Sequence, residues 1–301
     1  MSARTGLISP SRVLVLARQT FVQVMRMKVF YFLVVFAALM LAMLWVDFGS
    51  LGQVQDAEQS LRVMKGAAFF SMNVFATVFA IAATALLIPK DVEDRTLYTI
   101  LSKPVTRLDY LLGRYLGVIL MLGLGLLLMG MVFSMTMWHA LEGVMAEQVA
   151  VMQQMGFSQE LMDARVAQLR EQGMGVQLGV YSVFLKAAVL AAVALCISTF
   201  STSTLFTLVA TVVVMLVGLL VDEARSVMLE YAAAGRESGV LSLAHWVAYM
   251  FPDFKLMSLE DATIHGKDVP VGLALRVTWV ALLHVALSVV LSWFIFRKKE
   301  V

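Results

Sequence analysis

The chain alternates between long stretches without any charged residue and shorter polar segments. A helix rises about 1.5 Å per residue, so about 20 apolar residues cross the roughly 30 Å hydrocarbon core of a bilayer. The stretch at 187–221 is too long for one crossing and contains the polar sequence STFSTST at 198–204, which predicts two helices joined by a turn. The pattern predicts six membrane-spanning helices, at about 29–49, 67–89, 113–138, 179–199, 203–221 and 276–296.

Composition supports an all-α polytopic membrane protein. Hydrophobic residues make up 60% of the chain, charged residues make up 15%, and the mean hydropathy is +0.85. These values exclude an ordinary soluble domain. All five prolines lie outside the predicted spans or at their ends, where they free no backbone group in lipid: they are residues 10, 89, 104, 252 and 270.

The distribution of charge predicts which polar segments face the cytoplasm. If the amino terminus is inside, the inner segments hold 13 Lys and Arg residues against 5 Asp and Glu, and the outer segments hold 10 against 16. An excess of Lys and Arg marks cytoplasmic segments, so both termini are expected there. The net charge of +2 averages two opposed compartments, and no nucleic-acid partner is expected. The inner segments are 1–28, 90–114 and 297–301, and the outer ones are 47–66, 139–186 and 222–276.

Residues 9–27 are expected to form an amphipathic helix along the cytoplasmic membrane surface. Ser9 and Pro10 suit an N-cap followed by proline in the first turn. A helix of this kind is a simple flanking anchor or a specific partner contact. Its predicted polar face carries Arg12, Gln19, Gln23 and Arg26, and its predicted apolar face carries Leu14, Ala17, Phe21 and Met25.

Two outer loops, 139–178 and 222–275, are too short for an independent catalytic domain. The first is expected to form two short helices broken at Gly156–Phe157. The second places aromatic residues ahead of Pro252, which suits a segment that dips into the outer interface.

A polar insert at 90–112 separates the second and third spans. We expect Asp91 to cap a short surface helix that stops before Pro104. Thr106 and Asp109 then have the spacing of a capping box, which predicts the start of the next helix. Gly113 and Gly117 have the GxxxG spacing that allows helices to approach closely.

The insert resembles the corresponding segment of ABC-2 type transporter permeases. That segment contains Leu-Ser-x-Pro-Val-x-Arg, and Arg114 stands where the family commonly has lysine. The length and span number are similar to the subgroup associated with maturation of multicopper enzymes such as nitrous-oxide reductase, with Tyr249-x-x-Pro252 as the counterpart of an element before the last span. The matching residues are Glu93, Arg95, Thr96, Leu97, Leu101, Ser102, Pro104, Val105, Arg107, Leu111 and Gly113.

The resemblance implies a transport subunit in the bacterial cytoplasmic (inner) membrane. A separate ABC ATPase subunit would bind ATP and Mg²⁺ and grip the insert, and a second permease copy or a paralogue would complete the membrane unit. The sequence itself contains no phosphate-loop motif. The residues implied for coupling to the ATPase are Glu93, Arg95, Thr96, Leu97, Pro104 and Arg107.

Other polar residues within the spans are candidates for a substrate path. An ionisable residue in the membrane is a functional candidate, although a neutral His284 bonded to a neighbouring helix is the simpler interpretation. The path candidates are His284, Asn73, Thr77 and Thr84.

Two further functions remain alternatives. Thioether and imidazole ligands suit Cu(I), so Met135, Met137 and His139 are candidates for a metal site, although methionine is also ordinary apolar packing. The chain would then be an ATP-independent metal or ion carrier. A membrane scaffold that recruits a periplasmic protein through its outer loops is the other alternative.

Overall fold

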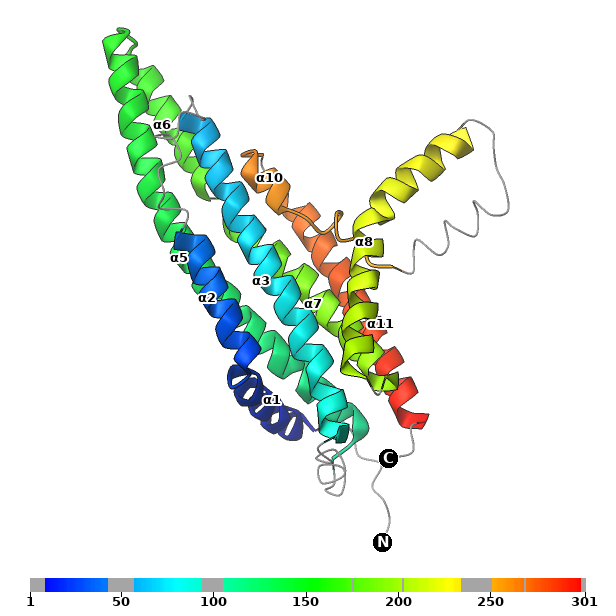
Figure 1. The fold of residues 1–301 in the computed structure, drawn as a ribbon. Helices are drawn as coiled ribbons and strands as arrows, with labels where there is room; N and C mark the ends of the chain where they lie inside the picture. Colours follow the sequence, from blue (N-terminus) through cyan, green and yellow to red (C-terminus); the bar gives the residue numbers. More distant parts are fainter. Residues whose placement is uncertain are drawn as a thin grey trace.

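The computed structural model describes residues 9–42, 57–93, 105–174, 176–201, 203–233, 251–267 and 269–298. All regular secondary structure in these ranges is α-helical, and most helices run along one common direction (Figure 1). The helices are α1 (Pro10–Met25), α2 (Lys28–Ala42), α3 (Ala57–Glu93), α5 (Arg107–Gln154), α6 (Gln159–Met174), α7 (Val176–Phe200), α8 (Thr204–Ala233), α10 (Glu260–Ile264) and α11 (Val271–Lys298).

Five of these helices, α3, α5, α7, α8 and α11, are long and apolar enough to cross a membrane. They contain five of the six predicted spans. The remaining predicted span, 29–49, begins in α2 and continues outside the described residues. The total of six spans and the orientation stay predictions.

The turn predicted near 198–204 is present. Helix α7 ends at Phe200 and α8 begins at Thr204. The backbone N–H of Ser203 donates to the hydroxyl of Ser201 at 3.1 Å, so a side chain takes up a backbone donor just before α8 begins. The polar residues therefore stabilise the reversal between two apolar helices.

Helix α5 is much longer than the span predicted at 113–138. It continues to Gln154, so the first of the two short helices expected in the 139–178 loop is a continuation of α5. The break at Gly156 is confirmed: this residue has a φ of 76°, a conformation that glycine adopts at little cost. Helix α6 then runs back beside α5 (Figure 1).

Aromatic packing joins α3, α5 and α7 into the core of the molecule. The rings of Phe69 and Phe133 meet edge to face, with centroids 5.5 Å apart. Both side chains are buried. A Cβ atom on Gly179 of α7 would lie 2.3 Å from the ring of Phe69, so only glycine fits there without a shift.

Helix α1 packs against α5 at the predicted GxxxG pair. A Cβ atom on Gly113 would lie 2.4 Å from Cβ of Leu16, and one on Gly117 would lie 2.5 Å from Cβ of Thr20. The absence of side chains at these two positions lets the helices touch, as the spacing predicts.

The predicted apolar face of α1 is divided, because Ala17 is buried against the protein whereas other residues of this face point outward. Leu14 and Met25 are exposed, at 69% and 38%. The sequence pattern alone could not distinguish the apolar residues of α1 that pack on α5 from those that stay exposed on its surface. The buried residues of α1 are Val13, Leu16, Ala17, Thr20 and Val24.

The expectation that Asp91 caps a new helix is wrong. Helix α3 continues through Pro89 to Glu93, so Asp91 lies inside its last turn. Pro89 removes one helical hydrogen bond and crowds the carbonyl one turn earlier, yet α3 continues past it for another turn.

The residues after Pro252 fold back into the bundle. Phe254, Met257 and Leu259 are buried in an apolar cluster with residues of α3, α7 and α11. A Cβ atom on Gly218 of α8 would lie 2.5 Å from the carbonyl oxygen of Pro252. This packing agrees with an entry into the bundle near Pro252, although residues 245–250 lie outside the described residues.

Candidate functional site

The start of α5 carries the capping box predicted from Thr106 and Asp109. The backbone N–H of Asp109 donates to the Thr106 hydroxyl at 3.1 Å, and the Thr106 N–H donates to the Asp109 carboxylate at 3.4 Å. The two residues thus satisfy each other's backbone donors, which fixes where α5 begins.

Asp109 also binds the start of α1, one hundred residues earlier in the chain. Its carboxylate accepts the backbone N–H of Ser9 at 3.2 Å and lies 3.8 Å from the guanidinium of Arg12. Ser9 is the N-cap residue of α1, as predicted, but its own side chain makes no capping hydrogen bond. A single carboxylate therefore holds the first turns of α1 and α5 together.

Five residues after Asp109 in α5, Arg114 forms a buried ion pair with Asp91 of α3. The Tyr110 hydroxyl donates to the same carboxylate at 2.5 Å. The guanidinium also donates to Gln23 at 2.6 Å and to Thr20 at 3.2 Å, both on α1. These bonds join three helices through groups that are nearly free of solvent, where a charge needs a partner.

A fourth helix, α11, ends on the same part of α5. One guanidinium nitrogen of Arg107 donates to the carbonyls of Phe296 at 2.5 Å and Arg297 at 2.8 Å. The ring of Tyr110 stacks on that of Phe296, with centroids 5.9 Å apart. A cation at the carbonyl end of a helix is favourable because the last carbonyls there lack helical donors.

The first eight residues of α5, 107–114, therefore hold α1, α3 and α11, and we call this arrangement the α5 hub. It is the junction through which the chain passes from α3 to α5 by way of residues 94–104. The charged and polar side chains of the hub already bind one another through ion pairs and hydrogen bonds. Its chemistry suits the transmission of movement between helices.

Four of the six residues predicted to couple to an ATPase lie outside the described residues. These are Arg95, Thr96, Leu97 and Pro104. Glu93 is the last residue of α3, and its side chain is also outside the described set. Arg107 is half-buried against the end of α11.

The proposed path residues of α3 lie on one face of that helix, at intervals of four and seven residues. Asn73 donates to Glu260 at 3.1 Å. Thr77 is half-buried, and Thr84 is buried with no hydrogen-bond partner for its hydroxyl among the described residues. His284 donates from Nδ1 to the Val280 carbonyl of its own helix at 2.8 Å, whereas a bond to a neighbouring helix was expected.

A second ion pair, between Lys186 of α7 and Glu260 of α10, was not predicted from the sequence. Lys186 lies inside the predicted span 179–199, so His284 is not the only ionisable side chain within a span. The Ser182 hydroxyl donates to the same carboxylate at 2.6 Å. The sequence shows that Lys186 lies within a predicted span, and this position alone could have marked it as a candidate. The sequence does not indicate that it pairs with Glu260, which lies 74 residues further along the chain.

The surroundings of Glu260 favour its charged form. Burial alone would raise the pKa of the carboxyl, but the charge of Lys186 and the hydrogen bonds from Lys186 and Ser182 outweigh burial, so the pKa is lowered. Glu260 therefore anchors the segment after Pro252 to α7 and, through Asn73, to α3.

The three residues of the metal hypothesis do not converge. Met135 and His139 lie on the exposed face of α5, and Met137 is buried on another face. Residues two apart on a helix point in nearly opposite directions, so one ion cannot bind all three in this chain.

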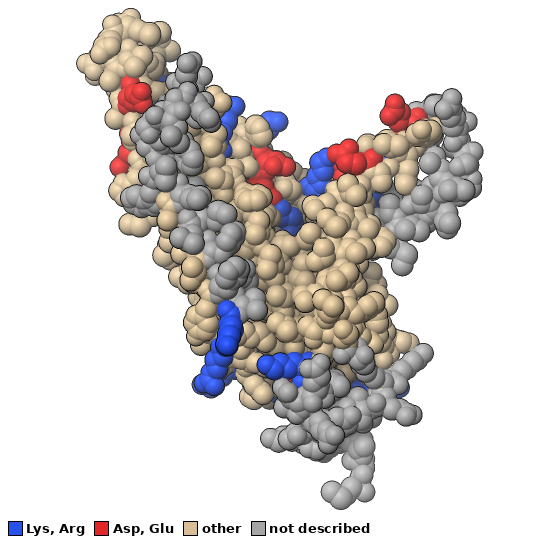
Figure 2. Space-filling model, viewed as in Figure 1, with Lys and Arg blue, Asp and Glu red and all other residues tan. Residues whose placement is uncertain are grey.

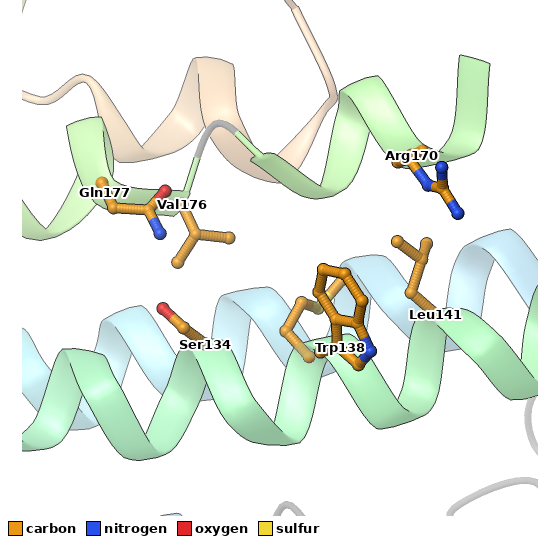
Figure 3. Close-up of a pocket in the computed structure, with 7 residues that line it drawn as sticks. Ser134, Trp138, Leu141, Arg170, Val176 and Gln177 are labelled. Carbon is orange, nitrogen blue, oxygen red and sulfur yellow. The ribbon is translucent and has the colours of Figure 1, made fainter. Parts of the chain in front are cut away.

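A pocket of about 500 Å³ lies between α5 and the segment where α6 ends and α7 begins (Figure 3). Trp138 and Leu141 of α5 line one wall, and the exposed guanidinium of Arg170 on α6 lies opposite. The Trp138 indole donates to Glu142 at 2.6 Å. A largely apolar pocket with one cation suits an amphiphile that carries an anionic group.

Comparisons with known proteins do not identify the chain. No family model matches it, and no curated protein matches it.

Proposed function

We propose that this protein is the permease subunit of an ABC-2 type transporter in a bacterial inner membrane. A separate ATPase subunit would bind ATP and Mg²⁺ and dock on residues 94–104, and the chain itself would move an unidentified substrate without being an enzyme. The proposal combines the motif of residues 93–113 with a multi-pass helical fold.

The observation that carries the proposal is the α5 hub. A segment that receives force from a soluble motor must be attached firmly to the helices that it moves. Asp91 lies in the last turn of α3, just before residues 94–104, and Arg114 follows them in α5. The ion pair between these residues, extended to α1 by Gln23 and to α11 by Arg107, would turn a push on the segment into movement of four helices.

The arrangement of charge favours the cytoplasmic placement of the hub. Figure 2 shows Lys and Arg side chains near the lower end of the molecule, beside α1, whereas toward the upper end Asp and Glu side chains lie among further Lys and Arg. A positive bias at the lower end is what the positive-inside rule expects if the hub faces the cytoplasm.

Apolar surface on α8 and α11 supports contact with membrane lipids or with a second permease copy. Leu205 and Phe206 of α8 and Trp279 and Leu283 of α11 are each more than half exposed. Side chains of this kind are stable only against lipid or another apolar surface. We propose that part of this surface forms the dimer contact and the rest meets lipid.

The test is purification of the full chain in mild detergent from cells that co-express the neighbouring genes. We expect an ATPase subunit to copurify with the wild-type chain. The Arg95→Glu variant should insert normally but lose the subunit or fail to couple its ATP hydrolysis to transport. Lys267→Glu, which reverses an exposed charge near α10, is the matched control and should behave as the wild type.

Retention of normal ATPase binding and transport by Arg95→Glu would count against docking at this segment. Stoichiometric copper binding by the isolated chain, with no ATPase in the purified material, would instead favour the metal-carrier alternative.

A further inference from the structure

A cavity of about 730 Å³ lies in the corner where α1, α2 and the last turns of α3 meet. Val22 and Met27 line it from the end of α1 and the link to α2, and Leu86 lines it from α3. It is open to the outside at the level where α2 begins and the apolar part of α3 ends. In a membrane, this is the depth of the lipid headgroups.

Cationic side chains from all three helices surround the cavity. Arg26 ends α1, Lys28 begins α2, and Lys90 lies in the last turn of α3. All three side chains are exposed, and none has a hydrogen bond or an ion pair with another described residue. Asp91, a carboxylate of the same lining, is paired with Arg114, so the lining keeps a net positive charge that attracts an anion.

The buried wall of the cavity supplies a further donor. Arg114 is only 2% exposed, and its Nη atoms bind Asp91, Gln23 and Thr20. Its Nε has no hydrogen-bond partner in the described part of the chain. A buried N–H without a partner is costly, and a bound anion or a water held by one would satisfy it.

The geometry points to a binding site for the phosphate of an anionic phospholipid in this cavity. The cations provide the recognition of phosphate, and Val22, Met27 and Leu86 provide an apolar wall for the start of the acyl chains. Because Gln23 and Arg114 belong to both the cavity and the α5 hub, a bound lipid would also hold α1 against α3. This site does not depend on the proposed transport function.

The test uses the delipidated full-length chain in detergent micelles that contain phosphatidylglycerol or phosphatidylcholine with the same acyl chains. Bound lipid is counted by native mass spectrometry, and thermal unfolding is followed in parallel. We expect the chain to bind phosphatidylglycerol and gain thermal stability, whereas phosphatidylcholine and inorganic phosphate should give neither effect.

The variant Lys28→Gln/Lys90→Gln removes two exposed cations of the cavity. Each contributes about a fivefold gain in affinity at a membrane surface, so the double variant should bind phosphatidylglycerol roughly 30-fold more weakly. Arg18→Gln/Lys267→Gln removes two exposed cations that do not line the cavity and should bind as the wild type. Since all four side chains are exposed, both variants should fold.

Three results would overturn the proposal. Equal binding of the two lipids would show that the net negative charge of the headgroup is not recognised. Equal loss of affinity in the two double variants would place the effect in the overall charge of the chain. An equal gain in stability with inorganic phosphate would identify a free anion as the occupant.

Discussion

Arg114 and Asp91, which lie on different helices on either side of the polar insert, form an ion pair that is almost fully removed from solvent. Arg114 stands at the motif position where ABC-2 permeases commonly carry lysine. Its planar guanidinium serves Asp91, Gln23 and Thr20 at once, which a single ammonium group would do with less fixed geometry. The residue identified by the motif is thus a structural link between the insert and three helices.

Removal of Asp91 should destabilise the protein strongly. Asp91→Ala leaves the guanidinium of Arg114 buried without its counter-charge, so we expect a loss of about 3–5 kcal/mol in the free energy of unfolding. Replacing both partners, as in Asp91→Leu/Arg114→Met, should recover most of this loss because no charge is then buried. Unfolding in mixed SDS micelles, followed by tryptophan fluorescence, measures both values.

Asp163→Ala, at an exposed position on α6, is the control for this measurement and should change stability little. If Asp91→Ala and the double variant were equally destabilised, the cost would arise from packing, and the argument from an uncompensated charge would be wrong.

The close contact of α1 with α5 should depend on Gly117. A Cβ atom there would lie 2.5 Å from Cβ of Thr20 and 2.7 Å from the carbonyl oxygen of Ala17, so α1 must shift. We expect Gly117→Ala to cost about 1–3 kcal/mol, the usual range for overpacking. Gly143 is also on α5 but has open space around it, so Gly143→Ala should instead stabilise by up to about 1 kcal/mol.

Limited proteolysis provides the second measurement for this pair. Gly117→Ala should expose α1 to cleavage, and Gly143→Ala should not. If α1 were equally protected from cleavage in both variants, α1 and α5 would accommodate the added methyl group at Gly117 without losing their contact.

Features that depend on nearby residues could be predicted from the sequence. The capping box of Thr106 and Asp109 and the turn after Phe200 each arise within a few residues of the chain. The spacing of Gly113 and Gly117 likewise predicts close helix packing, although it does not identify α1 as the partner. The long apolar runs predicted helices because a backbone in lipid must satisfy its own hydrogen bonds.

Features that depend on residues far apart in the chain could not be predicted. Nothing near Glu260 indicates that its partner is Lys186, and nothing near Asp91 indicates that it faces Arg114. Asp91 after Pro89 has the local pattern of a cap, yet burial of its carboxylate against α5 keeps α3 helical. Long-range packing overrides local preference at such positions.

Stability should fall in acid because of Glu260. Its pKa in the folded protein is lower than the ordinary value of 4.5, so below that value the unfolded chain takes up a proton that the folded chain does not. The contribution of Glu260 is therefore complete above pH 4.5 and is lost as the pH falls through its folded value. Unfolding of the wild type should show a steeper dependence on pH in this window than that of Glu260→Gln.

Asp163→Asn removes an exposed carboxyl on α6 and should keep the wild-type dependence on pH. The same slope in Glu260→Gln and the wild type would mean that other carboxyl groups determine the acid sensitivity.

The end of α11 should loosen when Arg107 is replaced, even in the absence of any partner protein. Arg107→Gln removes the cation that binds the carbonyls of Phe296 and Arg297, an interaction of about 0.3–1 kcal/mol at a helix end. Hydrogen–deuterium exchange in the last turn of α11 should therefore become about twofold to fivefold faster. Arg297→Gln is the control, because the guanidinium of Arg297 lies over the ring of Trp293 and its loss leaves the carbonyls bound to Arg107.

If Arg107→Gln left exchange in α11 unchanged but abolished coupling to an ATPase, Arg107 would act on the partner and not through α11. Faster exchange in α11 together with a loss of coupling would mean that α11 is one of the helices that the insert moves.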